Sequence, residues 1–504
     1  MATPVRVPPE QEFTLNPIIA GRDQAAAAAG QAPAARWALA GLSLAMLLAS
    51  LGTSSANVGL PTLAQAFDAS FQAVQWVVLA YLLAITTLIV SVGRLGDIIG
   101  RRRLLLAGLA LFTAASILCG AAPTLGWLIA ARAVQGLGAA IMMALAIALA
   151  GEIVPKARTG SAMGLLGTMS AIGTALGPSL GGVLIAGPGW RAIFLVMVPL
   201  GLLNLLLARR TLPAPGQGMP GPQATRQRSG FDHPGTLLLG LTLAAYALAM
   251  TVGGGRFDGV NLALLLAAAV GGSLFVLVEA RVASPLIALA VFRERALSGS
   301  LGTNALVSTV MMATLVVGPF HLSRALGLDA ALVGLVMSIG PVISALIGLP
   351  AGRLVDRFGA AFMVVAGLVA MAAGALALSV IPAGFGVAGY IGAIAVLTPG
   401  YALFQAANNT AVMRDVHPDR RGTVSGMLSL SRNLGLVTGA SVMGAVFAAA
   451  AGATDMGTAP PQAVAWGMHM TFAVAAALIV VALAIAIAAH RRTARDGAPA
   501  GNRG

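Results

Sequence analysis

The chain has 504 residues, of which 58% are hydrophobic and 9% charged, and its formal net charge is +14. Its mean hydropathy of +0.90 excludes a water-soluble globular domain and indicates an integral membrane protein. The positive charge does not indicate a nucleic-acid partner, because aromatic residues make up only 5% of the chain and the basic residues do not gather among them in one domain.

Residues 1–36 precede the first long apolar run and contain proline, glutamine and an alanine-rich stretch. We expect them to form a disordered cytoplasmic tail. The apolar run that follows begins too far along the chain for a secretory signal peptide, so we expect it to remain as the first membrane span.

A helix needs about 20 apolar residues to cross a bilayer, and fourteen segments of the chain have this character. None shows the alternating ten-residue pattern of a membrane β-barrel. The sequence therefore predicts an all-α integral membrane protein with 14 transmembrane helices. The predicted spans are 37–57, 74–92, 104–122, 127–150, 161–186, 191–208, 236–253, 261–280, 298–321, 330–351, 360–381, 386–410, 422–450 and 467–490.

These spans divide into two six-helix bundles, residues 37–208 and 298–490, with two inserted helices at 236–280. Residues 209–235 are rich in proline, glycine and glutamine and predict a cytoplasmic linker. Residues 281–297 predict an interfacial segment, and residues 491–504 predict a cytoplasmic tail. Most arginines fall in cytoplasmic segments if the amino terminus is cytoplasmic, so the positive-inside rule places both termini in the cytoplasm, at a bacterial inner membrane.

The same pattern follows the second and tenth spans, as "GRLGDIIG" from Gly93 and "GRLVDRFG" from Gly352. Such an echo is typical of transporters built from two related halves, with the substrate site between them. Glycines allow sharp turns, and the aspartates can pair with arginines or a helix amino terminus. The alternative is an ordinary capped loop. The candidate gating residues are Gly93, Arg94, Asp97, Gly100, Arg101, Gly352, Asp356 and Arg357.

Two further stretches stand out in the fourth and fifth spans. Arg132, in "LIAARAVQGLGAA", is costly near hydrocarbon and should face a partner or water. "GTALGPSLGG" carries Gly173, Gly177, Pro178, Gly181 and Gly182, which allow close helix approach and a bend. The alternative for this second stretch is tight packing alone.

Uncharged polar side chains within apolar spans are candidates for a substrate cavity, or else hydrogen-bond between helices. Together with Arg132 and Arg432, and with no acid at mid-span, they predict neutral or anionic amphiphilic substrates rather than multivalent cations. Arg432 is the charged candidate for this cavity, and the uncharged candidates are Asn57, Gln75, Trp76, Tyr81, Gln135, Asn304, Tyr401, Gln405, Asn408 and Asn409.

The first repeat and the Arg132 stretch resemble motifs of the major facilitator superfamily, and Arg132 is with Glu152 a candidate for coupling. The glycine-rich stretch resembles the fifth-helix motif that is typical of exporters in this superfamily. "WRAIFLVMVPLG", "PLIALAVFR" and "RRGTVSGMLSLSRNLG" resemble its fourteen-span drug:proton antiporter branch. The resemblance implies multidrug efflux, antibiotic resistance, and a gating role for Asp97 and Arg101. Ile98 departs from the family pattern, which has a basic residue there.

In that branch the first helix usually ends in Leu-Asp-x-x-x-x-Asn-x-Ala-Leu-Pro, whereas here Gly52 stands at the acidic position, within "LGTSSANVGLP". The neutral polar residues of this stretch either line a vestibule or bind a neighbouring helix. Glu152 is then the preferred proton carrier, although a solvated helix-end carboxylate is the simpler interpretation. His321 can titrate near neutral pH but fits an interfacial polar tip.

We therefore expect a secondary active transporter, working as a monomer, that exports small amphiphilic compounds by alternating access with proton antiport. Coupling is weak, carried by Glu152, or absent. A metabolite importer or uniporter on the same scaffold is the alternative. The sequence has no catalytic constellation, and its single cysteine, Cys119, excludes an internal disulfide, so we expect no enzyme, cofactor or metal site.

Overall fold

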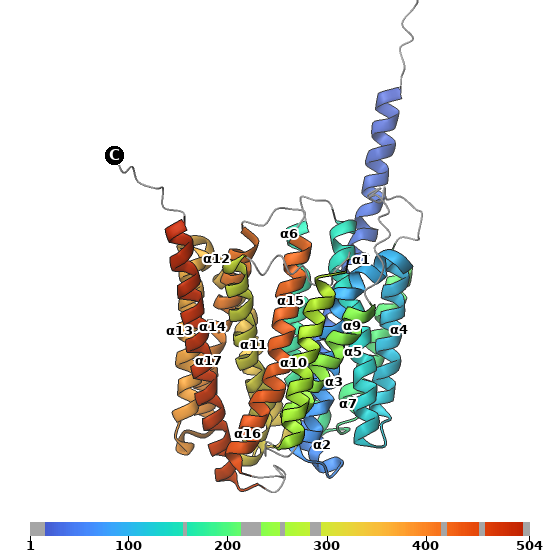
Figure 1. Cartoon of the computed structure of the whole chain (residues 1–504). Helices are drawn as coiled ribbons and strands as arrows, with labels where there is room; N and C mark the ends of the chain where they lie inside the picture. Colours follow the sequence, from blue (N-terminus) through green and yellow to red (C-terminus); the bar gives the residue numbers. More distant parts are fainter. Residues whose placement is uncertain are drawn as a thin grey trace, which may run out of the picture.

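The computed structural model describes residues 16–154, 159–212, 233–252, 258–282, 294–414, 421–452 and 459–496. All regular elements within these ranges are helices, and 14 segments are long and apolar enough to cross a membrane. The predicted all-helical architecture and number of spans are therefore confirmed. The helices stand side by side, and both ends of the described chain lie at the same end of the bundle (Figure 1). We call this end the termini side and the other the opposite side.

The first group of helices covers the chain up to residue 211. Ser70 and Thr124 begin two of them by accepting a hydrogen bond from the backbone N–H three residues on, as N-cap residues do. The elements are α1 (Asn16–Val58), α2 (Leu60–Ala66), α3 (Phe71–Ile99), α4 (Arg101–Gly120), α5 (Leu125–Ile153), α6 (Thr159–Ala186), α7 (Ala192–Leu195) and α8 (Met197–Thr211).

Helix α1 begins much earlier than the predicted span. Residues 16–36 are helical, so the prediction of a disordered tail is wrong for this stretch. The physical reason is its run of alanines, the residue with the highest helix propensity, which continues directly into the apolar span. Residues 1–15, 213–232, 283–293 and 497–504 lie outside the described part of the chain, so most of the predicted linker and of the interfacial segment does too.

The remaining helices include two short π-helical turns, η3 and η6. The elements are α9 (His233–Thr251), α10 (Gly259–Glu279), α11 (Arg295–Phe320), η3 (His321–Ala325), α12 (Ala330–Phe358), α13 (Ala360–Val380), η4 (Ala383–Phe385), α14 (Gly386–Arg414), α15 (Arg421–Thr438), η6 (Gly439–Met443), α16 (Gly444–Ala451) and α17 (Pro461–Asp496). The turn η6 interrupts the predicted span 422–450, whereas η3 extends the helix beyond the predicted end of the span 298–321.

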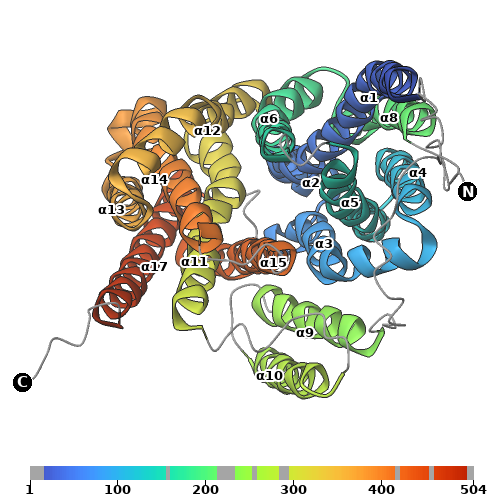
Figure 2. The ribbon, with the colours of Figure 1, turned by 90° about the horizontal axis from the view of Figure 1, so that it is seen from above.

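Seen from above, α9 and α10 lie together beside α3 and α15, outside the other helices (Figure 2). Helix α9 is fastened to α3 near both ends. Trp76 Nε1 donates to Thr251 Oγ1 at 3.0 Å, and the hydroxyls of Ser91 and Thr236 are 2.8 Å apart. Asn261 of α10 donates to two carbonyls at the end of α9. The inserted pair is thus anchored through α9, while α10 presents apolar side chains outward, as a lipid-facing helix does.

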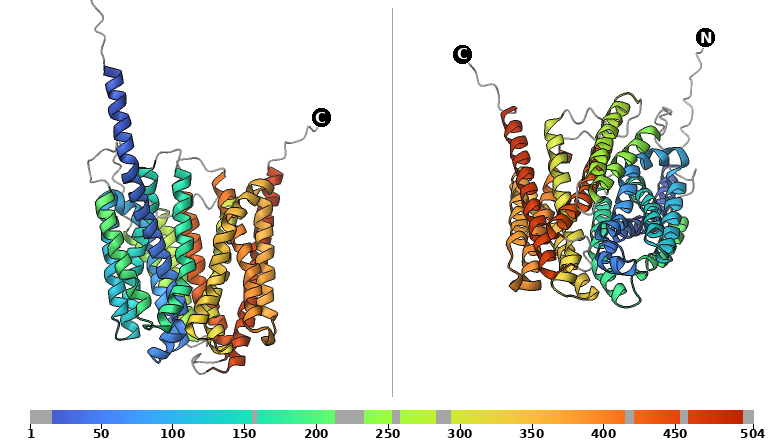
Figure 3. Two further views of the ribbon diagram at one scale, coloured as in Figure 1. Left: turned by 180° about the vertical axis from the view of Figure 1, so that it is seen from behind. Right: turned by 60° about the horizontal axis from the view of Figure 1, so that its bottom comes forward.

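The helices α1–α8 and α11–α17 form two groups, which we call the first and second halves (Figure 3). On the opposite side, α6 and α12 touch through their backbones. A Cβ atom added to Gly182 would lie 2.6 Å from the Ala330 carbonyl oxygen and 2.8 Å from Gly334 Cα. Two glycines at one crossing permit this approach, as small residues do between membrane helices.

An aromatic cluster joins the halves at the same level. Phe71 at the start of α3 packs against Phe320 of α11 and Phe447 of α16, with ring centroids 4.7 and 5.4 Å away. The Phe71–Phe320 pair meets edge to face, a favourable geometry for two aromatic rings. Backbone contact and aromatic packing therefore hold the halves together on the opposite side.

Candidate functional site

A cavity of about 400 Å³ lies between the two halves. Helices α1, α3, α5 and α6 of the first half line it, together with α11, α12, α14 and α15 of the second. Its volume is within the range of small-molecule sites. Because both halves supply its walls, a change in their relative position must change the shape of the cavity.

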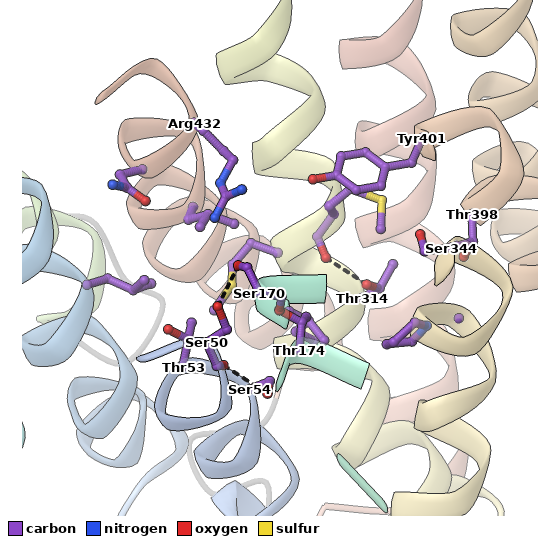
Figure 4. Close-up of a pocket in the computed structure, with 18 of the residues that line it drawn as sticks. Ser50, Thr53, Ser54, Ser170, Thr174, Thr314, Ser344, Thr398, Tyr401 and Arg432 are labelled. Atoms are coloured by element: carbon purple, nitrogen blue, oxygen red, sulfur yellow. Dashed lines mark hydrogen bonds between the residues drawn. The ribbon is translucent and has the colours of Figure 1, made fainter. Parts of the chain in front are cut away.

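Hydroxyl groups supply most of the polar lining of this cavity (Figure 4). The Ser50 and Ser170 hydroxyls are 2.6 Å apart, and Thr174 donates to the Ser170 carbonyl at 3.0 Å. A hydroxyl that donates within its own helix keeps lone pairs that can accept from a ligand. The hydroxyl residues of the lining are Ser50, Thr53, Ser54, Ser170, Thr174, Thr314, Ser344, Tyr390, Thr398, Tyr401 and Ser429.

The apolar lining is rich in methionine. Thioether side chains are flexible and polarizable, and they adapt to ligands of different shape. The methionines of the lining are Met46, Met143, Met311, Met312 and Met337. Among the described lining residues Arg432 is the single charged side chain. The cavity is therefore an adaptable apolar surface with many neutral polar groups and one cation.

Two of the predicted cavity residues, Tyr401 and Arg432, line this cavity. Gln405 is not among the lining residues, but its Nε2 donates to the Tyr401 hydroxyl at 3.0 Å. Asn408 is buried, with its amide nitrogen unpaired within the protein, whereas Asn409 is exposed. The polar residues of α14 are thus at the cavity wall, buried within the protein or exposed, and their polarity alone does not distinguish these positions.

The other predicted cavity residues are not among the lining residues, and the structure uses them in packing instead. Gln75 donates to the Ala440 carbonyl of η6 at 2.9 Å, and Asn304 donates to the Leu428 carbonyl of α15 at 3.0 Å. Trp76 binds α9, as described above. For all of these residues except Asn57, which donates to the Thr53 carbonyl of its own helix, the structure shows the alternative, a hydrogen bond to a neighbouring helix. The residues concerned are Asn57, Gln75, Trp76, Tyr81, Gln135 and Asn304.

Arg132 is fully buried inside the first half. Its Nε donates to the Val77 carbonyl at 2.8 Å and its Nη1 to Gln135 Oε1 at 2.5 Å. Its guanidinium carbon lies 4.1 Å from the centre of the Tyr81 ring, a cation–π distance. The partners that were expected for this buried arginine are therefore the Val77 carbonyl, the Gln135 amide and the Tyr81 ring. Arg132 joins helices within the first half.

Gly52 faces this same interior rather than the cavity. A Cβ atom there would lie 2.9 Å from the Tyr81 hydroxyl, which itself donates to the Ala49 carbonyl at 2.7 Å. Tyr81 thus occupies the space that a larger residue at position 52 would need. Its neighbours Thr53 and Ser54 line the cavity, while Asn57 is buried and bonds within its own helix. Ser54 Oγ also donates to the Gly173 carbonyl of α6 at 3.2 Å, so the polar stretch both lines the cavity and binds a neighbouring helix.

The glycine-rich stretch of α6 packs against α1 and α12. Cβ atoms added to Gly173 and Gly177 would clash with Leu47 and Ser54 of α1, and one added to Gly181 would lie 3.1 Å from the Ser55 carbonyl oxygen. Close packing is therefore part of what the motif does. It also places hydroxyls at the cavity, since Ser54 Oγ donates to the carbonyl of Gly173 at 3.2 Å.

Each of the two repeated motifs ends in a glycine with positive φ, +97° at Gly100 and +85° at Gly359. Left-handed backbone of this kind favours glycine. The rest of each motif is helical, so Gly352, Asp356 and Arg357 lie in the last turns of α12 rather than in a loop. The surroundings of Gly93 and the side chains of Arg94 and Asp97 lie outside the described part of the structure.

Arg101, which follows the first motif, forms an ion pair with Glu152 near the end of α5. The pair joins the start of α4 to α5 on the termini side, and its side chains are 32% and 40% exposed. A predicted gating residue and the preferred proton carrier therefore contact each other. His321, by contrast, is buried in η3 beside Tyr390 and is not an interfacial tip.

Comparison with known proteins identifies the family. The sequence pattern of the family described as "Major Facilitator Superfamily" matches residues 42–440 and, in a second match, residues 301–504. The chain is 32% identical to the multidrug resistance protein Stp of Mycobacterium tuberculosis, over 82% of this chain and 76% of that protein. It is 28% identical to the riboflavin transporter RibZ of Clostridioides difficile, over 89% of this chain and 96% of that protein.

Among solved structures, the chain resembles a bacterial homologue of the human lysosomal transporter Spinster in an inward-facing, unoccupied conformation. The TM-score is 0.66 at 16% identity, covering 93% of this chain and 99% of that chain, so this likeness bears on the fold alone. Together with fourteen spans and a cavity between two halves, the match over most of the sequence establishes that this chain belongs to the Major Facilitator Superfamily.

Proposed function

We propose that this transporter exports small amphiphilic compounds from the cytoplasm by alternating access, with both termini in the cytoplasm of a bacterial cell. The observation that carries the proposal is the cavity between the halves, whose methionines and hydroxyls suit ligands with apolar bodies and varied polar groups. The multidrug resistance named for its relative Stp supports the outward direction of transport.

Rocking of one half against the other is the motion that such a site requires. In the state described, the Gly182–Gly334 crossing and the Phe71 cluster join the halves on the opposite side. Release outward requires these contacts to separate. The ion pair between Arg101 and Glu152 lies at the other end of the molecule, where it stiffens the first half during that motion.

We propose that the coupling of export to proton movement is weak, is carried by Glu152, or is absent. No carboxylate is found among the described residues that line the cavity, and the position of the acid in related first helices is Gly52, enclosed by Tyr81. Substrate export from proteoliposomes with and without a pH gradient tests this. Gradient dependence that survives Glu152→Gln excludes Glu152 as the carrier.

A second candidate function is import or facilitated transport of a metabolite, favoured by the similarity to the riboflavin transporter RibZ. Accumulation of a panel of drugs and metabolites in cells with and without the transporter separates the two. Export predicts lower accumulation of amphiphilic drugs in cells that carry it. Higher accumulation of one metabolite, with drug levels unchanged, establishes the importer instead.

A further inference from the structure

Arg432 differs from the other arginine in the transporter interior. It lies on α15, half-buried, in the wall of the cavity. Within the described chain its guanidinium has no hydrogen bond and no ion pair. Arg132, by contrast, is enclosed and donates to a carbonyl and an amide. Arg132 is therefore used by the fold, whereas the donors of Arg432 are available to a ligand.

The charge of Arg432 is not balanced by the groups around it. The other described lining residues are neutral, so the positive potential of the guanidinium is not cancelled within the cavity. Walls of low dielectric strengthen such a potential and concentrate anions. An arginine offers five N–H donors in a planar fork that fits a carboxylate or sulfonate with two parallel hydrogen bonds.

The rest of the cavity fits the other end of such a ligand. In Figure 4 the Arg432 side chain points from α15 toward the Ser50–Ser170 pair. The apolar lining includes Met312 and Met337 of the second half, which can accommodate an apolar body of variable shape. The volume of about 400 Å³ suits one small molecule.

We propose that Arg432 is the anion-binding subsite of this cavity and that its preferred ligands are anionic amphiphiles, carboxylates or sulfonates with an apolar body. The assignment rests on the proposed function for the direction of transport, but not for binding. It narrows the substrate class from amphiphiles in general to those with one acidic group.

Two dyes with the same skeleton test the subsite. 8-Anilinonaphthalene-1-sulfonate is anionic, and N-phenyl-1-naphthylamine is its neutral counterpart without the sulfonate. Binding of each is measured by fluorescence on the full-length transporter in phosphatidylcholine nanodiscs, with empty nanodiscs subtracted, for wild type, Arg432→Gln, Arg432→Lys and the control Arg210→Gln. Arg210 is an exposed cation on α8, outside the cavity. Transport of both dyes into everted vesicles is measured in parallel.

Arg432→Gln is expected to weaken binding of the sulfonate by about 10-fold or more, the usual contribution of a charge-assisted hydrogen-bond pair, and to leave the neutral dye unchanged. Arg432→Lys should recover part of the loss, and Arg210→Gln should have no effect. Equal affinity of wild type and Arg432→Gln for the sulfonate, or equal loss for both dyes, overturns the subsite.

The headgroup of an anionic lipid could also supply the negative charge that binds Arg432. Adding phosphatidylglycerol to the nanodiscs should leave sulfonate binding unchanged; competition in wild type that Arg432→Gln abolishes would assign Arg432 to lipid and overturn the proposal. Selective sulfonate binding without transport of either dye into everted vesicles would count against export while upholding the subsite.

Discussion

Gly52 is the position at which a single added carbon tests the packing of the first half most sharply. In Gly52→Ala the new methyl carbon would lie 2.9 Å from the Tyr81 hydroxyl oxygen and 3.3 Å from Tyr81 Cζ. Tyr81 must then move, although its hydroxyl donates to Ala49 and its ring lies under Arg132. We expect a loss of about 1–3 kcal/mol in the free energy of unfolding, the usual cost of overpacking.

Tyr81→Phe removes the clashing oxygen but also the hydrogen bond to Ala49, at a cost of about 1 kcal/mol. In the double variant the two losses should not add, because the methyl fills space that the hydroxyl has left. The total should fall short of the sum by about 1 kcal/mol or more. Denaturant unfolding in detergent micelles, followed by fluorescence, measures this. Strict additivity, or an unperturbed Gly52→Ala, refutes the packing described here.

Further variants test three separate contacts. Gly334→Ala should reduce transport, because its Cβ would lie 2.8 Å from Gly182 Cα and wedge α12 from α6; wild-type transport by this variant would contradict that crossing. Arg101→Gln and Glu152→Gln should each lower the free energy of unfolding by no more than about 1 kcal/mol, as expected of an exposed pair, and the double variant should lose less than the sum of the two; additive losses in a double-mutant cycle would exclude an energetic coupling between them. Trp76→Phe removes the bond to Thr251 and should speed proteolytic cleavage between α9 and α10 in reconstituted vesicles; an unchanged cleavage rate would show that this bond does not anchor α9.

The membrane spans could be predicted from the sequence because an apolar run of sufficient length has few alternatives to a spanning helix. The helical extension of α1 could not, because alanine-rich sequence is common both in solvated tails and in helices. The π-helical turns η3 and η6 could not be predicted from the sequence either, because one extra residue in a helical turn leaves the pattern of apolar residues almost unchanged.

The cavity was predicted less well than the spans. Amide side chains in an apolar helix, such as Gln75 and Asn304, are candidates for substrate binding, but here they donate hydrogen bonds to carbonyls of neighbouring helices. Outside "LGTSSANVGLP", serine and threonine are not among the predicted cavity residues, because they are common in spans and can bond their own backbone. Their four-residue spacing, Ser50 with Ser54 and Ser170 with Thr174, was the signal available, because such residues share a helix face.

The measurement that tests the central claim most directly is transport by a transporter whose cavity has been filled. Ser344 lines the cavity on α12, and Leu346, two residues later, is 71% exposed and is not part of the lining. We predict that Ser344→Trp abolishes export of N-phenyl-1-naphthylamine in everted vesicles, while Leu346→Trp, at equal protein level, transports as wild type does. Undiminished export by Ser344→Trp would contradict the claim that substrate passes through the cavity between the two halves.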